Sequence, residues 1–179
     1  MSKIGKIHIL IPEKVKVLLS GNTVNVEGPL GKESVNVDLD MFDLSINEGK
    51  AVSIKPKKMN DNSKRLWGMN RSLLNNAIVG ASRGYEKILE LTGVGYRAVL
   101  KDKILNMQLG FSHDINYEIP KGIKISVDKQ TTLKINGSNK QQVGMVASQI
   151  KSIRPPEPYK GKGIKEKGQY ILRKEGKKK

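Results

Sequence analysis

Short hydrophobic runs with polar residues between them fill the first 55 positions and predict β-strands. Gly21-Asn22 separates the first two runs and suits a tight turn, because glycine accepts a positive φ. The predicted strands are Val15–Leu19, Thr23–Glu27, Glu33–Val37 and Ala51–Lys55.

The pattern changes from strand to helix after residue 60. Asp61, Asn62 and Ser63 are all good N-cap residues, and hydrophobic positions recur behind them at helical spacing. Glycines at positions 80 and 84 predict the end of this helix. The stripe predicted to face a core consists of Leu66, Met69, Leu73 and Ala77, widened by Trp67, Leu74 and Ile78.

The second half of the chain repeats the order of several strands followed by one helix. Ser138 or Asn139 is expected to cap this helix, and Pro155 stops it because the residue before a proline disfavours helical angles. Asp102-Lys103 predicts a turn equivalent to Gly21-Asn22. The helix is predicted to bury Val143, Val146, Ala147 and Ile150. The predicted strands are Glu86–Leu91, Tyr96–Leu100, Ile104–Leu109, Ile123–Val127 and Thr132–Ile135, with a late strand at Gln169–Leu172.

Similar residues in the two halves indicate a duplication. The run NSKRLWGM at 62–69 resembles SNKQQVGM at 138–145, and VNVE at 24–27 aligns with LNMQ at 105–108. The sequence therefore predicts an α+β fold with two duplicated domains, 1–82 and 83–179. Each is expected to be a mostly antiparallel sheet with one helix packed on a face, and an extended basic segment follows at 154–179.

Composition excludes several kinds of site. The chain has no cysteine and only two histidines, His8 and His113, which lie in different halves, so neither a metal nor another cofactor is expected. No apolar run reaches 18 residues, so no membrane span is predicted. The N-terminus lacks a secretory or transit pattern, which favours a cytoplasmic location and leaves an organelle-encoded copy open.

Positive charge is concentrated at the C-terminus. Residues 1–82 carry 12 basic and 8 acidic side chains, residues 83–150 carry 10 and 6, and residues 151–179 carry 11 and 3. Half of the net charge of +16 thus lies in less than a fifth of the chain. Such a concentration indicates a polyanionic partner.

The segment RPPEPYKGKGI at 154–164 favours nucleic acid as that partner. Its prolines stiffen the backbone, its glycines permit close approach to another surface, and its lysines can meet phosphates. Tyr159 could stack on a base or pack against the prolines. A solvated tail, a DNA-binding tail and a ligand for a proline-binding domain remain alternatives. The hydrophobic residues Ile164, Tyr170, Ile171 and Leu172 are predicted to dock on a domain.

No constellation of residues indicates catalysis or a small-molecule substrate. Asp38, Asp40 and Asp43 cluster in a predicted exposed loop, and no nucleophile accompanies them. The run Gly93-Val94-Gly95 lacks the third glycine and the following helix of a dinucleotide loop, so it predicts a hairpin or bulge. Secondary RNA contacts are predicted at Lys64, Arg65, Arg71, Tyr96 and Arg97.

Three runs resemble a known family. They are SLLNNAIVGASRGYEK at 72–87, LTGVGYRA at 91–98 and RPPEPYKGKGI at 154–164, and they are similar to ribosomal protein six of the bacterial large subunit. The opening SKIGK at 2–6 and the GPLG turn at 28–31 are also similar, so the resemblance covers essentially the whole chain. Two positions depart from the family pattern, Leu172 where a basic residue is usual and Trp67 where histidine is common.

The resemblance implies a structural protein of the large subunit with two duplicated α+β domains. It implies binding to 23S rRNA, chiefly through the second domain, near the sarcin–ricin loop and the stalk base. Neighbouring ribosomal proteins at the stalk base and translation GTPases would lie nearby. The residues carried over are Arg154, Pro155, Pro156, Tyr159, Lys160, Gly161, Lys162 and Gly163, joined by Lys165, Lys167, Arg173 and Lys174.

Overall fold

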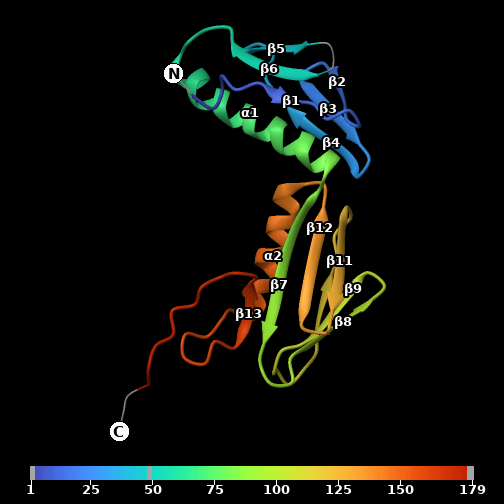
Figure 1. Cartoon of the computed structure of the whole chain (residues 1–179), viewed down its shortest axis with the longest axis vertical. Coiled ribbons are helices and arrows are strands. Elements are labelled where there is room, and N and C mark those ends of the chain that lie inside the picture. The colour runs from blue at the N-terminus through green and yellow to red at the C-terminus, as the bar shows by residue number, and fades with distance from the viewer. Residues whose placement is uncertain (1–2, 48–49, 177–179) are drawn as a thin grey trace. The chain divides into compact units, whose positions relative to one another are not determined.

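The computed structural model describes residues 3–47 and 50–176 and divides into two compact units. The first consists of residues 1–84 with 138–140, and the second of residues 85–137 with 141–179, so the chain passes from one to the other between Gly84 and Tyr85. Both combine antiparallel strands with one long helix (Figure 1). The predicted α+β fold is confirmed.

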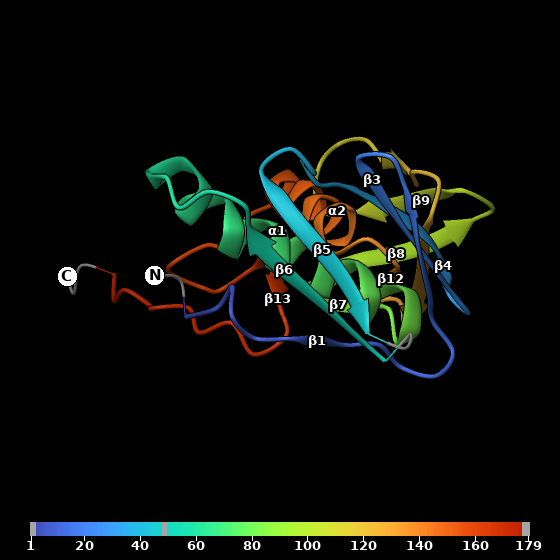
Figure 2. The ribbon, with the colours of Figure 1, turned by 90° about the horizontal axis from the view of Figure 1, so that it is seen from above.

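The first unit contains two three-stranded antiparallel sheets and a helix that packs on both. Figure 2 shows β5 and β6 passing across α1. One sheet has the order β1-β6-β5, formed by β1 (Ile9–Leu10), β6 (Ala51–Pro56) and β5 (Phe42–Asn47). The other has the order β2-β3-β4, formed by β2 (Lys16–Ser20), β3 (Thr23–Gly28) and β4 (Gly31–Asn36), and the helix is α1 (Asp61–Ser82).

The buried face of α1 matches the predicted stripe only in part. Trp67, Leu74, Ala77, Ile78 and Ala81 lie in the core, whereas Met69 is 49% exposed and Leu66 and Leu73 are only half-buried. The indole of Trp67 decides this orientation, because its Nε1 donates a hydrogen bond to the Ile54 carbonyl oxygen of β6 at 2.7 Å. The prediction that Met69 faces the core is therefore wrong.

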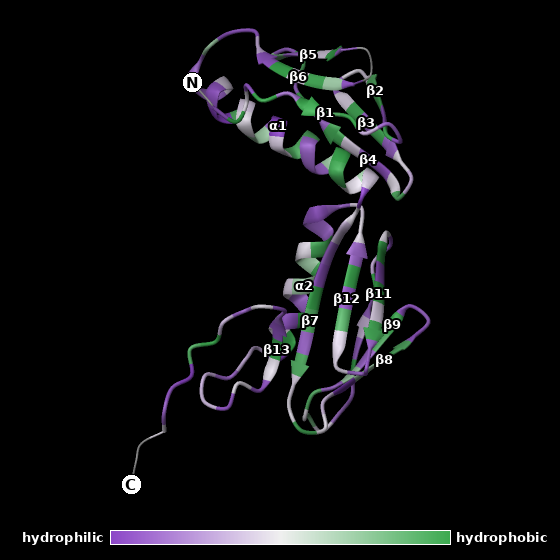
Figure 3. Cartoon of the chain, in the orientation of Figure 1, coloured by the Kyte–Doolittle hydropathy of each residue, from purple (hydrophilic) through white to green (hydrophobic). Residues whose placement is uncertain are grey.

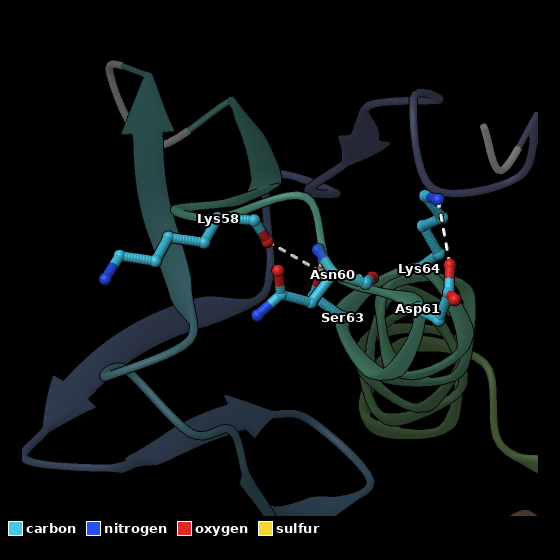
Figure 4. A network of polar contacts seen from close by, with 5 residues as sticks. All are labelled: Lys58, Asn60, Asp61, Ser63 and Lys64. Atoms are coloured by element: carbon cyan, nitrogen blue, oxygen red, sulfur yellow. Dashed lines mark hydrogen bonds and ion pairs between the residues drawn. The ribbon is translucent and has the colours of Figure 1, made fainter.

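The N-terminus of α1 is held by Ser63, which is buried (Figure 4). Its Oγ accepts a hydrogen bond from the Asn60 backbone N–H at 2.9 Å and lies 2.7 Å from the Lys58 carbonyl oxygen, to which it donates. These bonds satisfy backbone groups that a helix start would otherwise leave unpaired. The helix begins where Asp61, Asn62 and Ser63 predicted it.

Replacing Ser63 with alanine should lower the free energy of unfolding of the first unit by about 0.5–2 kcal/mol, since the hydrogen bond between its Oγ and the backbone N–H of the N-cap residue Asn60 is lost. Urea denaturation followed by the fluorescence of Trp67, which is buried in the same unit, would measure this loss. Ser72→Ala is the control, because the Ser72 hydroxyl bonds only the Gly68 carbonyl within the helix. Equal losses in the two variants would contradict a capping role for Ser63.

The second unit also has two antiparallel sheets and one helix. Hydrophobic and hydrophilic residues alternate along β7 and β12 (Figure 3), so one face of the sheet can pack on a core. The four-stranded sheet, order β11-β12-β7-β13, is formed by β11 (Ile123–Asp128), β12 (Thr132–Gly137), β7 (Tyr85–Thr92) and β13 (Gly163–Glu166). The second sheet is formed by β8 (Arg97–Lys101), β9 (Ile104–Gln108) and β10 (Ile115–Glu118), and the helix is α2 (Lys140–Ile153).

The strand orders confirm the duplication. The sheet β7-β12-β11 repeats β1-β6-β5, and β8-β9-β10 repeats β2-β3-β4. The two predicted hairpin turns also correspond, since Gly21 and Asp102 both have a positive φ, of 55° and 50°. β13 has no counterpart in the first unit and is added to the edge of β7.

The second helix agrees with its prediction, whereas four strands were not predicted. α2 buries Val143, Val146, Ala147 and Ile150, as expected. The sequence did not predict β1, β5, β10 or β13, and the strand predicted at Gln169–Leu172 is wrong because these residues form no strand. Within the residues that the structure describes, neither helix is long and apolar enough to cross a membrane.

Candidate nucleic-acid interface

The basic C-terminal segment is attached to the second unit by β13. Its four residues pair antiparallel with the edge of β7, from Gly163 opposite Thr92 to Glu166 opposite Leu89. Ile164 is fully buried in the core of the unit and confirms its predicted docking. This attachment fixes both the residues before β13 and those after it.

Residues 154–163, here called the basic loop, are closed by backbone hydrogen bonds. The Ile164 N–H donates to the Arg154 carbonyl oxygen at 2.8 Å and closes the base of the loop. The Glu157 N–H donates to the Lys162 carbonyl oxygen at 2.7 Å, and the Gly161 N–H donates to the Glu157 carbonyl oxygen at 3.0 Å. The basic loop therefore has its own internal structure and does not match a solvated tail.

Gly163 brings the two ends of the basic loop together. Its φ is +134°, a region that only glycine adopts readily, and a Cβ at this position would lie 2.6 Å from the Pro155 carbonyl oxygen. Of the three prolines, Pro156 is half-buried, whereas Pro155 and Pro158 are exposed. The closed backbone of the basic loop, and not burial of its prolines, is what distinguishes it from an extended ligand of a proline-binding domain.

Residues 167–176, here called the tail, return beside the basic loop (Figure 1). The Lys174 N–H donates to the Pro158 carbonyl oxygen at 2.9 Å, and the Lys167 N–H donates to the Ile88 carbonyl oxygen of β7 at 2.9 Å. The guanidinium of Arg173 lies over Gly161, with Nε 3.4 Å from the place of a Cβ. A hollow of about 390 Å³ lies between the tail and the rest of the second unit. It is lined by Thr92, Gly161, Lys165, Gln169, Tyr170, Ile171 and Arg173.

The tail does not dock through the residues that the sequence indicated. Tyr170 is 84% exposed and Leu172 is 68% exposed, while Ile171 is half-buried. Their expected docking as a late strand is wrong, because β12 and β13 already occupy both edges of β7. The tail is held by backbone hydrogen bonds instead.

Cations outnumber acidic residues among the exposed side chains of this region. Hydrophilic residues predominate along the basic loop and tail in Figure 3. Lys165 is an exception among the predicted contacts, since it is half-buried and its Nζ lies 3.2 Å from the Glu90 carboxylate. The exposed cations are Arg154, Lys160, Lys162, Lys167, Arg173 and Lys174.

Comparisons with the sequences of known proteins identify the family. A family model described as ribosomal protein L6 matches residues 92–167, a stretch that includes the basic loop and β13. The large ribosomal subunit protein uL6 of Paracoccus denitrificans is 46% identical over 179 residues, which cover all of both chains. The proteins of the same name from Beijerinckia indica and Caulobacter vibrioides are 44% and 46% identical, again over the full length of each. The chain belongs to the ribosomal protein L6 family. 

In this L6 family member, Glu166 ties the strand β13 to its surroundings. Its carboxylate lies 2.7 Å from Lys87 Nζ on β7 and 3.3 Å from Lys151 Nζ on α2. The hydrogen bonds from Lys87 and then Lys151 lower the pKa of Glu166 below its ordinary value of 4.5. Glu166 therefore links helix, sheet and C-terminal segment as long as it is ionised.

The contribution of Glu166 to stability should depend on pH. Because the folded state has the lower pKa, the contribution is present above about pH 4.5 and is lost as the pH falls through the folded pKa. Thermal unfolding of the parent and of Glu166→Gln should thus differ at neutral pH and converge in acid. Replacing Lys87 and Lys151 together with glutamine should remove the same pH dependence, and a difference that grew on acidification would contradict this arrangement.

The predicted secondary contacts are divided between the two units. Lys64, Arg65 and Arg71 lie on α1 in the first unit, where Lys64 pairs with Asp61 at 3.0 Å. Arg71 Nε donates to the Ile7 carbonyl oxygen at 3.2 Å. A solvated helix face therefore explains the positions of these three cations as well as an RNA contact does.

Tyr96 requires a correction. It is only 8% exposed and belongs to the core of the second unit. Its ring fills the space beside Gly93, where a Cβ would lie 2.8 Å from the ring. Tyr96 therefore has a structural role in the core, and its burial does not favour the predicted RNA contact. Arg97 is exposed, and its Nε donates to Gln108 Oε1 at 2.5 Å.

Two aromatic residues beside the basic loop were missed by the sequence analysis. The Arg154 guanidinium lies 4.9 Å from the centre of the Phe111 ring, and the rings of Phe111 and His113 stack with centroids 6.1 Å apart. The available indication was a phenylalanine placed directly after Gly110, in a stretch too polar for a strand.

No metal centre accompanies the interface. Across residues 3–47 and 50–176, no three histidine, aspartate or glutamate side chains are grouped so that they could hold an ion. The arrangement can bind an anionic polymer through side-chain cations on an ordered backbone.

Proposed function

We propose that this protein is a structural constituent of the large ribosomal subunit and binds 23S rRNA through its basic loop and tail. The observation that carries the proposal is the end-to-end similarity to proteins named large ribosomal subunit protein uL6. The concentration of exposed cations on the ordered basic loop supports it independently. The role is structural and not enzymatic.

The proposed mechanism is electrostatic and geometric. Lys160, Lys162 and the cations of the tail neutralise phosphates and release counterions from the RNA. The backbone hydrogen bonds that close the basic loop order it before binding, so less conformational entropy is lost on association. A thin, stiff loop can enter the space between RNA helices and hold them at a set separation, which makes recognition depend on RNA shape.

The proposed contacts are the predicted residues of the basic loop and tail, each with a distinct role. Arg154, Lys160, Lys162, Lys167, Arg173 and Lys174 supply exposed charge, and Tyr159 supplies an exposed ring. Gly161, Gly163, Pro155 and Pro156 shape the backbone. Lys165 contributes a charge that Glu90 partly neutralises. The second domain, 83–179, thereby provides the main RNA-binding surface.

The proposed place of binding is the neighbourhood of the sarcin–ricin loop and the stalk base. Ribosomal proteins of the stalk base would be neighbours, and translation GTPases would act close by. The protein would then work in the cytoplasm as part of the ribosome. Support for this finer placement comes from family membership.

Sedimentation of a tagged copy through a sucrose gradient, followed by chemical footprinting of the rRNA, would test the proposal. We expect the protein to migrate with the large subunit in high salt and to protect nucleotides near the sarcin–ricin loop. Protein that stays at the top of the gradient would refute ribosomal assembly. Migration with the subunit but protection elsewhere would refute only the proposed place. Salt-independent retention by a protein partner, or equal binding to duplex DNA, would favour the earlier alternatives.

A further inference from the structure

The aromatic pair Phe111 and His113 is exposed at the surface of the second unit. Phe111 is 40% exposed, His113 is exposed, and the two rings stack at a centroid separation of 6.1 Å with an interplanar angle of 26°. The core of this unit is complete without them, since neither belongs to it. Exposed stacked rings on a polar surface need a reason other than folding.

The connection that carries the pair, between β9 and β10, has a defined shape. Gly110 has a φ of +74°, and a Cβ there would lie 3.3 Å from the buried ring of Tyr96. At the other end, Gln108 Nε2 donates to the Asp114 carboxylate at 3.2 Å. The turn rests on the core at one side and is tied at its base, so the two rings have a fixed support.

The pair also adjoins the start of the basic loop. The Arg154 guanidinium lies 4.9 Å from the centroid of Phe111, which is a favourable cation–π distance. Arg154 closes the basic loop through its carbonyl oxygen, so its side chain joins the loop to the aromatic pair. A guanidinium and two aromatic rings are the planar groups on which proteins stack unpaired bases.

We infer that Phe111, His113 and Arg154 form a stacking site for an unpaired RNA base. The inference rests on the proposed RNA-binding function and adds a contact that phosphate neutralisation does not explain. A base fits the site better than a phosphate, because two of its three groups are aromatic rings, whose faces stack on a base. Lys160 and Lys162 of the basic loop would bind the phosphate backbone of the RNA, and the stacking site would bind a base.

Fluorescence anisotropy with two single-stranded RNA probes would separate stacking from charge. One probe is a ten-nucleotide oligoadenylate, and the other is the same strand with abasic central positions, which has equal charge and fewer bases to stack. The parent should bind the first more tightly by about 5- to 100-fold. The double variant Phe111→Ala, His113→Ala should bind both probes equally, and Phe111→Tyr, which keeps a ring, should retain the preference.

Further variants distinguish the failure of this inference from the failure of the proposed function. Lys160→Gln with Lys162→Gln should weaken binding to both probes and leave their ratio unchanged. Loss of the preference in Tyr159→Ala but not in the double variant would overturn the inference, because the exposed Tyr159 would then be the stacking residue. A parent that binds both probes equally would also overturn it. Binding of neither probe would overturn the stacking inference, whereas the RNA-binding function itself would be overturned only if the protein also failed to migrate with the large subunit.

Discussion

Changing Lys160 and Lys162 together to glutamine should lower affinity for 23S rRNA about 10- to 100-fold near 100 mM salt, since two phosphate contacts on an ordered loop are lost. For the parent, six to ten phosphate contacts would make affinity fall about 10³- to 10⁵-fold between 50 and 200 mM salt. In the variant, the slope of log K against log salt should be less steep by about 1.4–1.8. Filter binding over a salt series would measure both quantities.

The same change of charge elsewhere provides the control. Lys121 and Lys124 are exposed lysines of the second unit outside the basic loop and tail, so replacing them with glutamine should change affinity by less than about threefold. Removing Lys177–Lys179, which lie outside the described residues, should also have the smaller effect. Equal losses in all three variants would contradict the basic loop as the ordered anchor and would indicate binding through net charge alone.

Replacing Gly163 with alanine should destabilise the second unit by about 2–5 kcal/mol and disorder the basic loop. Two causes add, because the residue has a φ of +134° and its Cβ would lie 2.6 Å from the Pro155 carbonyl oxygen and 2.7 Å from Pro156 Cα. Both neighbours are backbone atoms and cannot move away as a flexible side chain can. Hydrogen exchange of the amides of Glu157, Gly161 and Ile164 should accelerate with the loss of their bonds.

Other glycines of the segment separate the two causes. Gly168 has a φ of +82° with open space around it, so Gly168→Ala should cost only about 1–2 kcal/mol. Gly176 has neither a positive φ nor a neighbour within 4 Å, so Gly176→Ala should be close to neutral. Trp67 lies in the core of the first unit, and its fluorescence should be unchanged in all three variants. Equal effects at positions 163 and 168 would contradict the packing against the prolines.

The helices show how far periodicity reaches. Both helices and their ends were predicted, since N-cap residues, glycines and a proline start or stop a helix through local backbone preferences. The buried face of α2 was also predicted, because its hydrophobic residues form one stripe. That of α1 was predicted only in part, since hydrophobic residues occur around much of this helix, and the buried Trp67, which bonds the Ile54 carbonyl oxygen, lies at the edge of the predicted stripe.

The strands show the limit of local patterns. β5 was missed because its aspartate and the acidic residues before it suggested a loop, although Phe42, Leu44 and Ile46 alternate as a half-buried strand does. β13 contains one hydrophobic residue, Ile164, and becomes a strand only because β7 offers a free edge. The run Gln169–Leu172 has better strand residues but no edge left to pair with.

The candidate site was predicted in its charge and not in its shape. The basic loop was recognised from its residues, because stiff prolines, slim glycines and cationic lysines together are typical of a segment that binds a polyanion. Its closure by Arg154, Glu157 and Gly163 depends on backbone atoms whose meeting the sequence does not reveal. The aromatic pair was overlooked for a related reason, since Phe111 and Arg154 are far apart in the chain and meet only in the folded unit.

By itself, the sequence determined the α+β class, the duplication, both helices and a cationic C-terminal segment, because each follows from local periodicity, capping residues or composition. The tertiary structure decided which face of α1 is buried, which residues complete the sheet as β13, and how the basic loop closes. It also buried Tyr96 and placed Phe111 beside Arg154. The physical reason is the same throughout, since these outcomes depend on contacts between residues distant in the chain, and such contacts leave no periodic trace in the sequence.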